Sequence, residues 1–387
     1  MTGTNQLRLY DYGLSHDQEK RAKRLHEDSI IINMLALGLV GPEAFTEDMD
    51  KQIKDDYEFF RDFWGRTMGL CMSMVVKMAV EGKFPALKEH WDISGVTANS
   101  AELRPQANIW GDVALWTYAF DHLDWLIKVR TTDDIRRAKA EGKHAALLHI
   151  QCTDWLNGGD LGLIDTLADL GFKAIQLTYN TMNLIGAGCT ERTDSGISNF
   201  GAMALQHMNQ RGILIDTGHC GHQTTLDACA LSKQPVIASH TLAKGVYGHD
   251  RAKGDDALLA LAKTGGVIGV AITPFLITDA ETVTMEHYFN HLDYVVKLVG
   301  WEHVGIGTDW PFQLPDWAMK LMSQYAVQSM GFRPEHRYGD VTTTHGYVDC
   351  RDFINITRGL VARGYTDEQI KAILGGNWLR VMDAVWK

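Results

Sequence analysis

The chain has 387 residues, of which 45% are hydrophobic and 22% are charged, and its formal net charge is −11. A chain of this length and composition can bury a large core. The acidic balance argues against a general affinity for nucleic acid or for an anionic membrane surface, because both require clustered Lys and Arg. We therefore expect a small-molecule substrate and a second copy of the chain as partners, with no nucleic acid and no membrane.

The N-terminal segment is polar and predicts a helical extension over residues 1–28. It lacks the apolar core of a signal peptide, and no apolar run approaches the roughly 18 residues of a membrane span. The six cysteines form no CxxC pair, which is typical of free thiols in a reducing compartment. These features predict a cytoplasmic protein.

Short apolar runs rich in β-branched residues recur along the chain and predict eight strands. They cover residues 30–33, 72–76, 145–150, 174–178, 213–216, 236–238, 267–272 and 304–307. Most are separated by segments with helical periodicity, at 161–170, 200–211, 223–231, 255–263 and 285–299. The segment 82–131 is long enough for an added helix pair, whose aromatic residues between Trp110 and Trp125 predict packing or a dimer contact.

Alternating strands and helices imply parallel strands with right-handed crossovers, and eight such units close into a (β/α)₈ barrel, the TIM barrel. A doubly wound open sheet is the alternative, but it more typically has five to seven strands and a Gly-rich first turn. No linker divides the chain, so we expect one domain over residues 1–387. Residues 366–387 predict a C-terminal helix that begins with an N-cap at Thr366 and is interrupted at Gly375 and Gly376.

Three predicted strands run into side chains that can bind a metal ion. His219 follows the strand in the sequence LIDTGH, His240 follows VIAS, and Asp309 follows GIGT. In a parallel barrel the carboxyl ends of all strands form one rim, where catalytic residues lie. A single histidine at a strand end is more often a packing residue, but three metal-competent side chains on one rim favour a catalytic metal site.

With these residues the resemblance to a known family becomes specific. Residues 131–143 (TTDDIRRAKAEGK), 265–270 (GGVIGV), 303–310 (HVGIGTDW) and 373–377 (ILGGN) extend it over about residues 20–387. The chain resembles the membrane (renal-type) dipeptidases, peptidase family M19 of the amidohydrolase superfamily. The resemblance implies a metal-dependent hydrolase barrel with added helices and a two-zinc centre that hydrolyses dipeptides.

The chain departs from the family pattern in half of that centre. The H-x-D motif after the first strand falls on Leu35 and Leu37, and the Glu that bridges the two ions falls on Gln151. A substrate-contacting His of the family falls on Tyr179. The resemblance therefore implies that the first metal site is absent.

The other half of the centre matches the family. The resemblance implies that His219 and His240 bind the second ion, that Asp309 handles the nucleophilic water, and that Arg251 grips the substrate carboxylate. Trp310, beside Asp309, is expected to contact the substrate. A catalytic zinc usually has three protein ligands and one open position, so Asp309 or Gln151 would have to be the third. A neutral amide oxygen is a weak ligand. We therefore expect either one loosely held divalent ion, which the resemblance implies is zinc, or no ion at all.

We therefore expect a hydrolase that acts on an amide or peptide-like bond of a small carboxylate-bearing substrate, with His219, His240 and Asp309 as catalytic residues. Gln151, Tyr179, Arg251 and Trp310 are expected to bind the substrate. Two alternatives stay open: a metal-independent lyase, decarboxylase or isomerase that uses a raised pKa of Asp309, and a noncatalytic ligand-binding homologue. A decayed centre, in which the two leucines merely fill space, is a further possibility.

Overall fold

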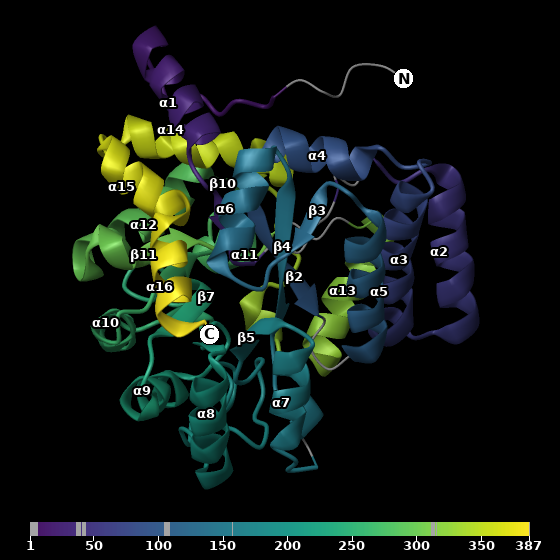
Figure 1. Ribbon diagram of the computed structural model, residues 1–387, viewed down its shortest axis with the longest axis vertical. Helices are drawn as coiled ribbons and strands as arrows, with labels where there is room; N and C mark the ends of the chain where they lie inside the picture. The colour runs from purple at the N-terminus through teal and green to yellow at the C-terminus, as the bar shows by residue number, and fades with distance from the viewer. Residues whose placement is uncertain are drawn as a thin grey trace.

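The structure is a computed structural model that describes residues 7–35, 40, 44–103, 109–156, 158–310, 314 and 316–386. Eight parallel strands close into a barrel (Figure 1). They are β1 (Ile32–Asn33), β2 (Ala98–Leu103), β4 (His144–Ile150), β5 (Phe172–Gln176), β6 (Leu214–Asp216), β7 (Val236–Ala243), β9 (Ile268–Val270) and β11 (Val304–Ile306). The ring closes because β1 pairs with both β2 and β11, and β2 pairs with β4. The predicted (β/α)₈ barrel is confirmed.

Helices surround the barrel between successive strands. These are α6 (Thr132–Glu141), α7 (Gly162–Asp169), α8 (Asn199–Arg211), α9 (His222–Leu231), α10 (Asp255–Lys263), α11 (Pro274–Ile277) and α12 (Met285–Val299). Two short strands extend the sheet, since β3 (Leu126–Lys128) pairs with β4 and β8 (Ala252–Lys253) pairs with β7. A separate parallel pair is formed by β10 (Val283–Thr284) and β12 (Thr344–His345).

Added helices form a group at one side of the barrel (Figure 1). The group contains α2 (Glu47–Phe60), α3 (Met68–Val80), α5 (Ile109–His122) and α13 (Asp316–Ser329), with α4 (Ala86–Ser94) at its upper end. The N-terminal helix α1 (His16–Asp28) packs against α14 (Ile354–Ala362). Within the described residues, no helix combines the length and the apolarity needed to cross a membrane.

Seven of the eight predicted strands overlap observed strands, and the prediction for residues 72–76 is wrong. This run lies inside α3, where Met68, Cys71 and Val75 are buried at helical spacing. The strand in that place of the barrel is β2, which lies in the segment predicted to hold only added helices. Its sequence, ANSAEL, contains no β-branched residue, so it carries no strand signal of its own.

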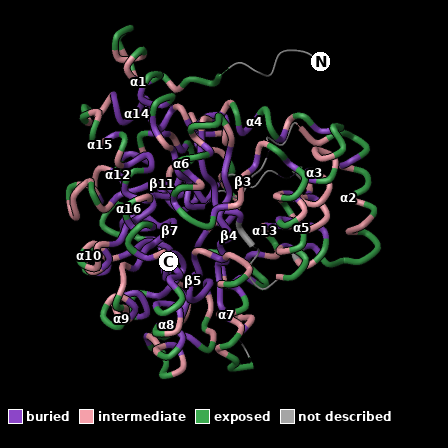
Figure 2. The backbone as a smooth tube through the Cα atoms, in the orientation of Figure 1, coloured by how far each residue is buried: buried purple, intermediate pink, exposed green. Residues whose placement is uncertain are grey.

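Two hydrophobic clusters follow from the alternation of strand side chains. The smaller cluster takes alternate strand residues such as Ile32, Leu147 and Leu214, together with residues of α16 (Asn377–Val385). The larger cluster takes their neighbours, such as Ile31 and Leu148, which pack on the surrounding helices. Side chains of a parallel barrel alternate in this way between the interior and the helical layer. Buried residues accordingly concentrate at the strands, and the exposed ones on the outer helices (Figure 2).

The C-terminal helix continues through the predicted interruption. A π-helical turn, Ala372–Gly376, joins α15 (Asp367–Lys371) to α16. The turn brings Gly375 so close to β1 that a Cβ there would lie 2.2 Å from the carbonyl oxygen of Ile30. The indole of Trp378 then donates to the carbonyl of Ile306, at 3.2 Å. A π turn thus lets the chain pass the barrel closely without ending the helix.

Candidate functional site

The candidate site lies at the carboxyl ends of the barrel strands. Gln151 follows β4 directly, and His219 and Asp309 lie three residues beyond β6 and β11. His240 was predicted to end its strand, but it lies inside β7, because this strand continues to Ala243. The register shift between β7 and β9 falls between Ala238 and Thr241, so it marks an irregularity at this histidine. Such irregularities re-aim side chains next to active sites.

His219 is held by hydrogen bonding and stacking. Its Nδ1 atom lies 2.7 Å from Oδ1 of Asn180. The ring stacks on Tyr179, with 4.0 Å between ring centroids and 20° between ring planes. The Nε2 atom is buried and has no hydrogen-bond partner among the described residues. Burial holds the pKa of His219 well below its usual range, so the ring is neutral at pH 7.

His240 faces the same space as His219. The two ring centroids are 4.9 Å apart. Nδ1 of His240 lies 2.8 Å from Oγ of Ser239, and its Nε2 lies 3.5 Å from Nε2 of Gln151 and 4.0 Å from Oδ2 of Asp309. Burial also lowers the pKa of His240 well below the usual range. Two neutral imidazoles therefore converge beside one carboxyl group.

Asp309 is a buried carboxyl group on a strained backbone. Its φ of 51° is in the left-handed region, which is uncommon for a residue other than glycine. The Asp309 amide donates to the carbonyl of Leu35 at 3.0 Å, and Thr273 Oγ1 donates to the Asp309 carbonyl at 2.9 Å. Burial raises the pKa of Asp309 to about 7, although the nearby Arg251 opposes the shift. Both protonation states are therefore populated near neutral pH, as a general acid or base requires.

Arg251 supplies a buried positive charge to the site. Its side chain is 2% exposed, and its Nη1 donates to the carbonyl of Gly218 at 2.6 Å. Its Nη2 lies 3.9 Å from Oδ2 of Asp309, and its Nε has no hydrogen-bond partner within the described part of the chain. Lys253 is also buried, and its Nζ donates to the carbonyl of Cys220 at 2.7 Å. Arg251 therefore keeps donors for a carboxylate ligand.

The two described family positions for the first ion carry no ionisable ligand. Leu35 is fully buried, and Gln151 is 2% exposed. The backbone carbonyl of Gln151 accepts from Nε2 of Gln176 at 2.5 Å. Leu37, the second position of the family motif, lies outside the described residues. His149, which shares strand parity with Gln151, is buried with its Nε2 3.0 Å from Oδ2 of Asp216.

Trp310 has a different environment from the other predicted site residues. Its Nε1 donates to the carbonyl of Thr342 at 3.2 Å, and its ring packs edge-on against Phe275 at 5.7 Å. Phe275 in turn contacts Phe332 and Tyr338. The structure thus brings the other six predicted residues to one rim, and it puts the Trp310 indole into an aromatic cluster.

Four polar residues at the site were not predicted from the sequence. Asn180, Asp216, Ser239 and Thr273 each bond directly to the imidazoles, to Asp309 or to a residue that does. Asp216 accepts from both the backbone amide and the hydroxyl of Ser239, at 2.7 and 2.5 Å. Burial disfavours the ionised form of Asp216, but hydrogen bonds from His149 and Ser239 prevail and lower its pKa to about 2. Their positions in the sequence could have indicated two of them, because Ser239 directly precedes His240 and Asn180 directly follows Tyr179.

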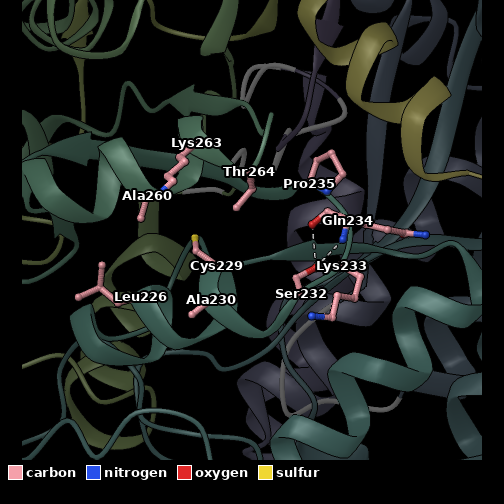
Figure 3. Close-up of a pocket in the computed structure, with 10 residues that line it drawn as sticks. All are labelled: Leu226, Cys229, Ala230, Ser232, Lys233, Gln234, Pro235, Ala260, Lys263 and Thr264. Carbon is pink, nitrogen blue, oxygen red and sulfur yellow. Dashed lines mark hydrogen bonds between the residues drawn. The ribbon is translucent and has the colours of Figure 1, made fainter.

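A pocket of about 410 Å³ lies away from this site (Figure 3). It is lined by α9, α10 and the segment before β7, at the amino-terminal end of that strand. Catalytic residues of a parallel barrel lie at the opposite end. Its hydroxyl groups are already used, since Ser232 donates to the carbonyl of Gln234 and Thr264 donates to that of Leu261. Burial raises the pKa of Cys229 to about 12, so this thiol is unreactive.

The donors at the rim fit part of a metal centre. Within the described residues, no group of three or more His, Cys, Asp or Glu side chains is arranged to hold a metal ion. The buried, unpartnered Nε2 of His219 and the neighbouring Nε2 of His240 are suitable donors for one ion. A second ion lacks donors at Leu35, and Gln151 offers only a neutral amide. Among the described residues, the rim therefore offers donors that suit one ion better than two.

The fold and this rim define the class of protein. A (β/α)₈ barrel that carries imidazoles and a perturbed carboxyl group at its strand ends belongs with the amidohydrolase barrels. An amidohydrolase from Pseudomonas aeruginosa has a similar solved structure, with a TM-score of 0.74 and 26% sequence identity. The match covers 94% of this chain and 99% of that one.

Sequence comparison then identifies the family. The model of the membrane dipeptidase family, peptidase family M19, matches residues 113–325, more than half of the chain. The chain therefore belongs to the membrane dipeptidase family, a family of hydrolases. The dipeptidase verJ of Clonostachys rogersoniana is 30% identical over 264 residues, which are 68% of this chain. The chain spans 61% of the length of that relative.

Further solved structures share the fold. The probable dipeptidase PvdM from Pseudomonas aeruginosa has a TM-score of 0.68 at 17% identity, and the match covers 96% of this chain and 99% of that one. A metallo peptidase from Rhodobacter sphaeroides, liganded with a phosphinate mimic of the dipeptide L-Ala-D-Ala, has a TM-score of 0.65 at 15% identity. That match covers 93% of this chain and 100% of the other.

Proposed function

We propose that this protein hydrolyses an amide or peptide-like bond of a small carboxylate-bearing molecule, with at most one divalent metal ion. The observation that carries the proposal is the convergence of two neutral imidazoles beside a carboxyl group whose pKa is about 7, on the rim of a membrane dipeptidase barrel. Family membership favours hydrolysis over lyase, decarboxylase or isomerase chemistry.

His219 and His240 would hold the ion through their Nε2 atoms, with Asp309 or the amide oxygen of Gln151 as the third ligand. Zinc is the ion that this donor set suits best. When bound, such an ion supplies Lewis acidity and makes water more acidic. Because the ligand set contains no carboxylate other than Asp309, the ion should be held weakly.

Asp309 is proposed to accept a proton from the attacking water and to pass it to the leaving amine. A group with a pKa near the working pH can perform both transfers. Arg251 would hold the substrate carboxylate through its planar guanidinium, whose Nε and Nη2 donors face the site. Tyr179, which stacks on His219, would orient the substrate together with Gln151, and Trp310 would border it.

The substrate class follows from these groups. A buried arginine favours a ligand with a free carboxylate, and the apolar Leu35 next to Asp309 favours an uncharged or apolar remainder. The phosphinate mimic of L-Ala-D-Ala bound by the Rhodobacter sphaeroides peptidase is a ligand of this size and charge. It is therefore a suitable probe of the site.

We also propose a cytoplasmic location and a homodimer. All six cysteines are free thiols, which supports a reducing compartment. Phe59 at the end of α2 is 78% exposed and Trp110 at the start of α5 is 53% exposed, which supports a protein contact at the added helices. Light scattering of the purified protein measures the mass; a monomer at micromolar concentration would contradict the dimer.

The decisive experiment measures bound metal and turnover in the same preparation. The protein is loaded with zinc, its metal content is determined by mass spectrometry, and hydrolysis of dipeptides and N-acyl amino acids is assayed before and after chelation. The double variant His219→Ala, His240→Ala should lose both the ion and the turnover. His207→Ala, on the exposed side of α8, is the matched control and should lose neither.

Three results would overturn parts of the proposal. Hydrolysis that survives chelation, in protein without metal, would remove the ion from the mechanism. Absence of hydrolysis, combined with chelator-insensitive conversion of a carboxylate substrate to another product, would support a metal-independent lyase, decarboxylase or isomerase. Absence of turnover on every substrate, combined with thermal stabilisation by the phosphinate, would support a noncatalytic ligand-binding homologue.

A further inference from the structure

We propose that Asn180 and the pair Asp216–Ser239 are positioning residues that hold the two imidazoles as the Nδ1–H tautomer before any ligand arrives. Both Nε2 lone pairs are then free to accept in the ligand-free protein, on rings whose centroids are 4.9 Å apart. The tautomers follow from the hydrogen bonds alone, whereas their use in binding a metal ion rests on the proposed function.

The tautomer of His219 follows from the orientation of one amide. Nδ2 of Asn180 donates to the backbone carbonyl of Met330 at 2.8 Å, so the amide oxygen points the other way. That oxygen lies 2.7 Å from Nδ1 of His219. A carbonyl oxygen only accepts, so Nδ1 carries the proton. In the neutral ring Nε2 is then unprotonated, and it is the buried atom that has no partner among the described residues.

Asp216 begins the chain of hydrogen bonds that determines the tautomer of His240. Its carboxyl group accepts from the amides of Gly218 and Ser239, at 3.0 and 2.7 Å, and from Oγ of Ser239 at 2.5 Å, and it lies 3.0 Å from Nε2 of His149. The amides can only donate, and hydrogen bonds from His149 and Ser239 lower the pKa of Asp216 to about 2, so the group binds as a carboxylate. It therefore takes the single hydroxyl proton of Ser239.

The hydroxyl group of Ser239 determines which nitrogen of His240 carries the proton. Because its only proton is directed at Asp216, the Oγ atom can only accept from the ring that lies 2.8 Å away. Nδ1 of His240 therefore carries the proton, and Nε2 is unprotonated. The opposite tautomer would place two lone pairs against each other at 2.8 Å.

The ring of His240 is also confined sterically. A Cβ at Gly218 would lie 2.9 Å from Cε1 of His240 and 2.6 Å from Oε1 of Gln176, so only glycine fits beneath the ring. Nε2 of Gln151, 3.5 Å from Nε2 of His240, has the polarity to donate to the free lone pair. A ring flip would break the bond to Ser239 and lose that contact. Both imidazoles are thus preset as acceptors.

A preset pair of acceptors binds a cation without rotating a ring or moving a proton between nitrogens. Partners of this kind orient metal-binding histidines, and their loss typically costs about 10- to 100-fold in metal affinity. Ser239→Ala should therefore weaken zinc binding by about that factor. Ser239→Thr retains the hydroxyl and should restore the affinity to within about threefold.

Nitrogen NMR of the metal-free protein tests the tautomers directly. In protein labelled with ¹⁵N-histidine and treated with chelator, long-range ¹H–¹⁵N spectra distinguish protonated from unprotonated ring nitrogens. Signals are assigned with His219→Gln and His240→Gln. The wild-type protein should show both rings protonated at Nδ1, and Ser239→Ala should shift His240 alone toward a mixture of tautomers.

The matched variants separate positioning from general damage. Asn180→Leu should alter the tautomer of His219 and spare His240. Thr217→Val removes a buried hydroxyl that donates to the carbonyl of Ile237 at 3.0 Å, and it should change neither ring. A wild-type ring protonated at Nε2, or an unchanged His240 tautomer in folded Ser239→Ala, would overturn the inference.

Zinc titration by calorimetry separates this inference from the proposed function. Preset tautomers in a protein that binds no zinc would uphold the positioning role and overturn the metal-dependent function. Zinc binding of equal strength in the wild type and Ser239→Ala would overturn the positioning role and leave the function standing.

Discussion

Two sets of positions on the barrel rim differ in how their polar groups are supported. At the ends of β6, β7 and β11, both imidazoles and Asp309 have hydrogen-bond partners that are themselves bonded to the scaffold. At the ends of β1 and β4, the two described family positions carry Leu35 and Gln151. The first set belongs to a polar network, and the second set is apolar or neutral.

This difference shows that one metal-ligand position can change without loss of the hydrogen bonds that hold the other ligands. Losing a first-strand ligand leaves these supports intact, because Ser239 bonds to Asp216 and Asn180 bonds to the backbone of Met330. Buried polar groups are costly unless they are hydrogen-bonded, and Nε2 of His219 and Nε of Arg251 are among the buried atoms that have no partner within the described residues. These unpartnered atoms argue that the imidazoles and Arg251 serve a ligand.

The largest expected effect of the difference is on ordinary dipeptidase activity. A pair of ions polarises the scissile carbonyl and activates water together, so losing one commonly costs several kcal/mol of barrier, which is roughly a thousandfold or more in rate. We expect kcat/KM for generic dipeptides to lie below typical enzyme values by that factor in zinc-saturated protein. Efficient zinc-dependent cleavage, at rates of about 10 per second, would show that the residues at the ends of β1 and β4 do not impair dipeptide hydrolysis.

The second prediction concerns a variant that restores the family's metal ligands at the ends of β1 and β4. The triple change Leu35→His, Leu37→Asp and Gln151→Glu supplies one imidazole and two carboxylates, and it should raise the zinc content from at most one ion toward two. Because Leu35 is fully buried, its replacement should cost roughly 2 to 5 kcal/mol of stability without metal. Mass spectrometry and thermal unfolding measure the two effects.

Leu35→His alone is the control for the second prediction. It places a lone imidazole in an apolar environment without a second new ligand, and it should not raise the metal content. A folded triple variant that binds no more zinc than the parent under zinc excess would show that the first strand was aligned wrongly with the family motif.

The third prediction concerns the pH dependence that Asp309 gives to the metal-free protein. Its pKa is about 7 when folded and near 4 when unfolded, so the protonated form is favoured by folding. Relative to Asp309→Asn, stability should be highest below pH 4, fall as the pH rises to 7, and then stay constant. At about 1.4 kcal/mol per pKa unit, the full loss is up to about 4 kcal/mol.

Chemical denaturation of chelated protein between pH 4 and 8 measures this difference. Asp133→Asn, whose parent side chain is 88% exposed, controls for the removal of one charge. A difference between wild type and Asp309→Asn that does not change with pH would mean that Asp309 ionises normally.

The smallest expected effect concerns the grip on the substrate carboxylate. Arg251→Lys keeps the charge but loses the two-pronged donor geometry. It should raise KM for the true substrate about tenfold, or about 1.4 kcal/mol, and alter kcat less. Arg136→Lys, on the exposed helix α6, should change neither constant, and an unchanged KM in Arg251→Lys would remove Arg251 from the substrate site.

Much of the fold was predictable because most barrel strands carry β-branched apolar runs. The exceptions are informative. β2 is built from small and polar residues and is a strand because β1 and β4 pair with it on both sides. The run 72–76 has strand-like residues but lies in a helix, where tertiary packing overrides a local preference.

The site was predictable as far as the strand ends and the family motif allowed. The positions of His219, His240 and Asp309 follow from the pattern, but their hydrogen-bond partners do not. Asn180 reaches His219 only because residues 39 positions apart meet at the rim, and the bond from Thr273 to Asp309 spans 36. Trp310 was predicted to contact the substrate because it adjoins Asp309. Its ring packs against Phe275, a contact that the local sequence does not predict.

The Trp378 anchor has a consequence for the order of synthesis. A Cβ at Gly305 would lie 2.4 Å from the indole nitrogen of Trp378, so the indole occupies a space on β11 that only glycine leaves free. The first barrel strand pairs with the last, and the π-helical turn that contacts both begins at residue 372. A nascent chain on the ribosome therefore cannot complete this barrel until almost all of it has emerged. Until then the edges of the first strands remain unpaired, and chaperones can bind the incomplete barrel.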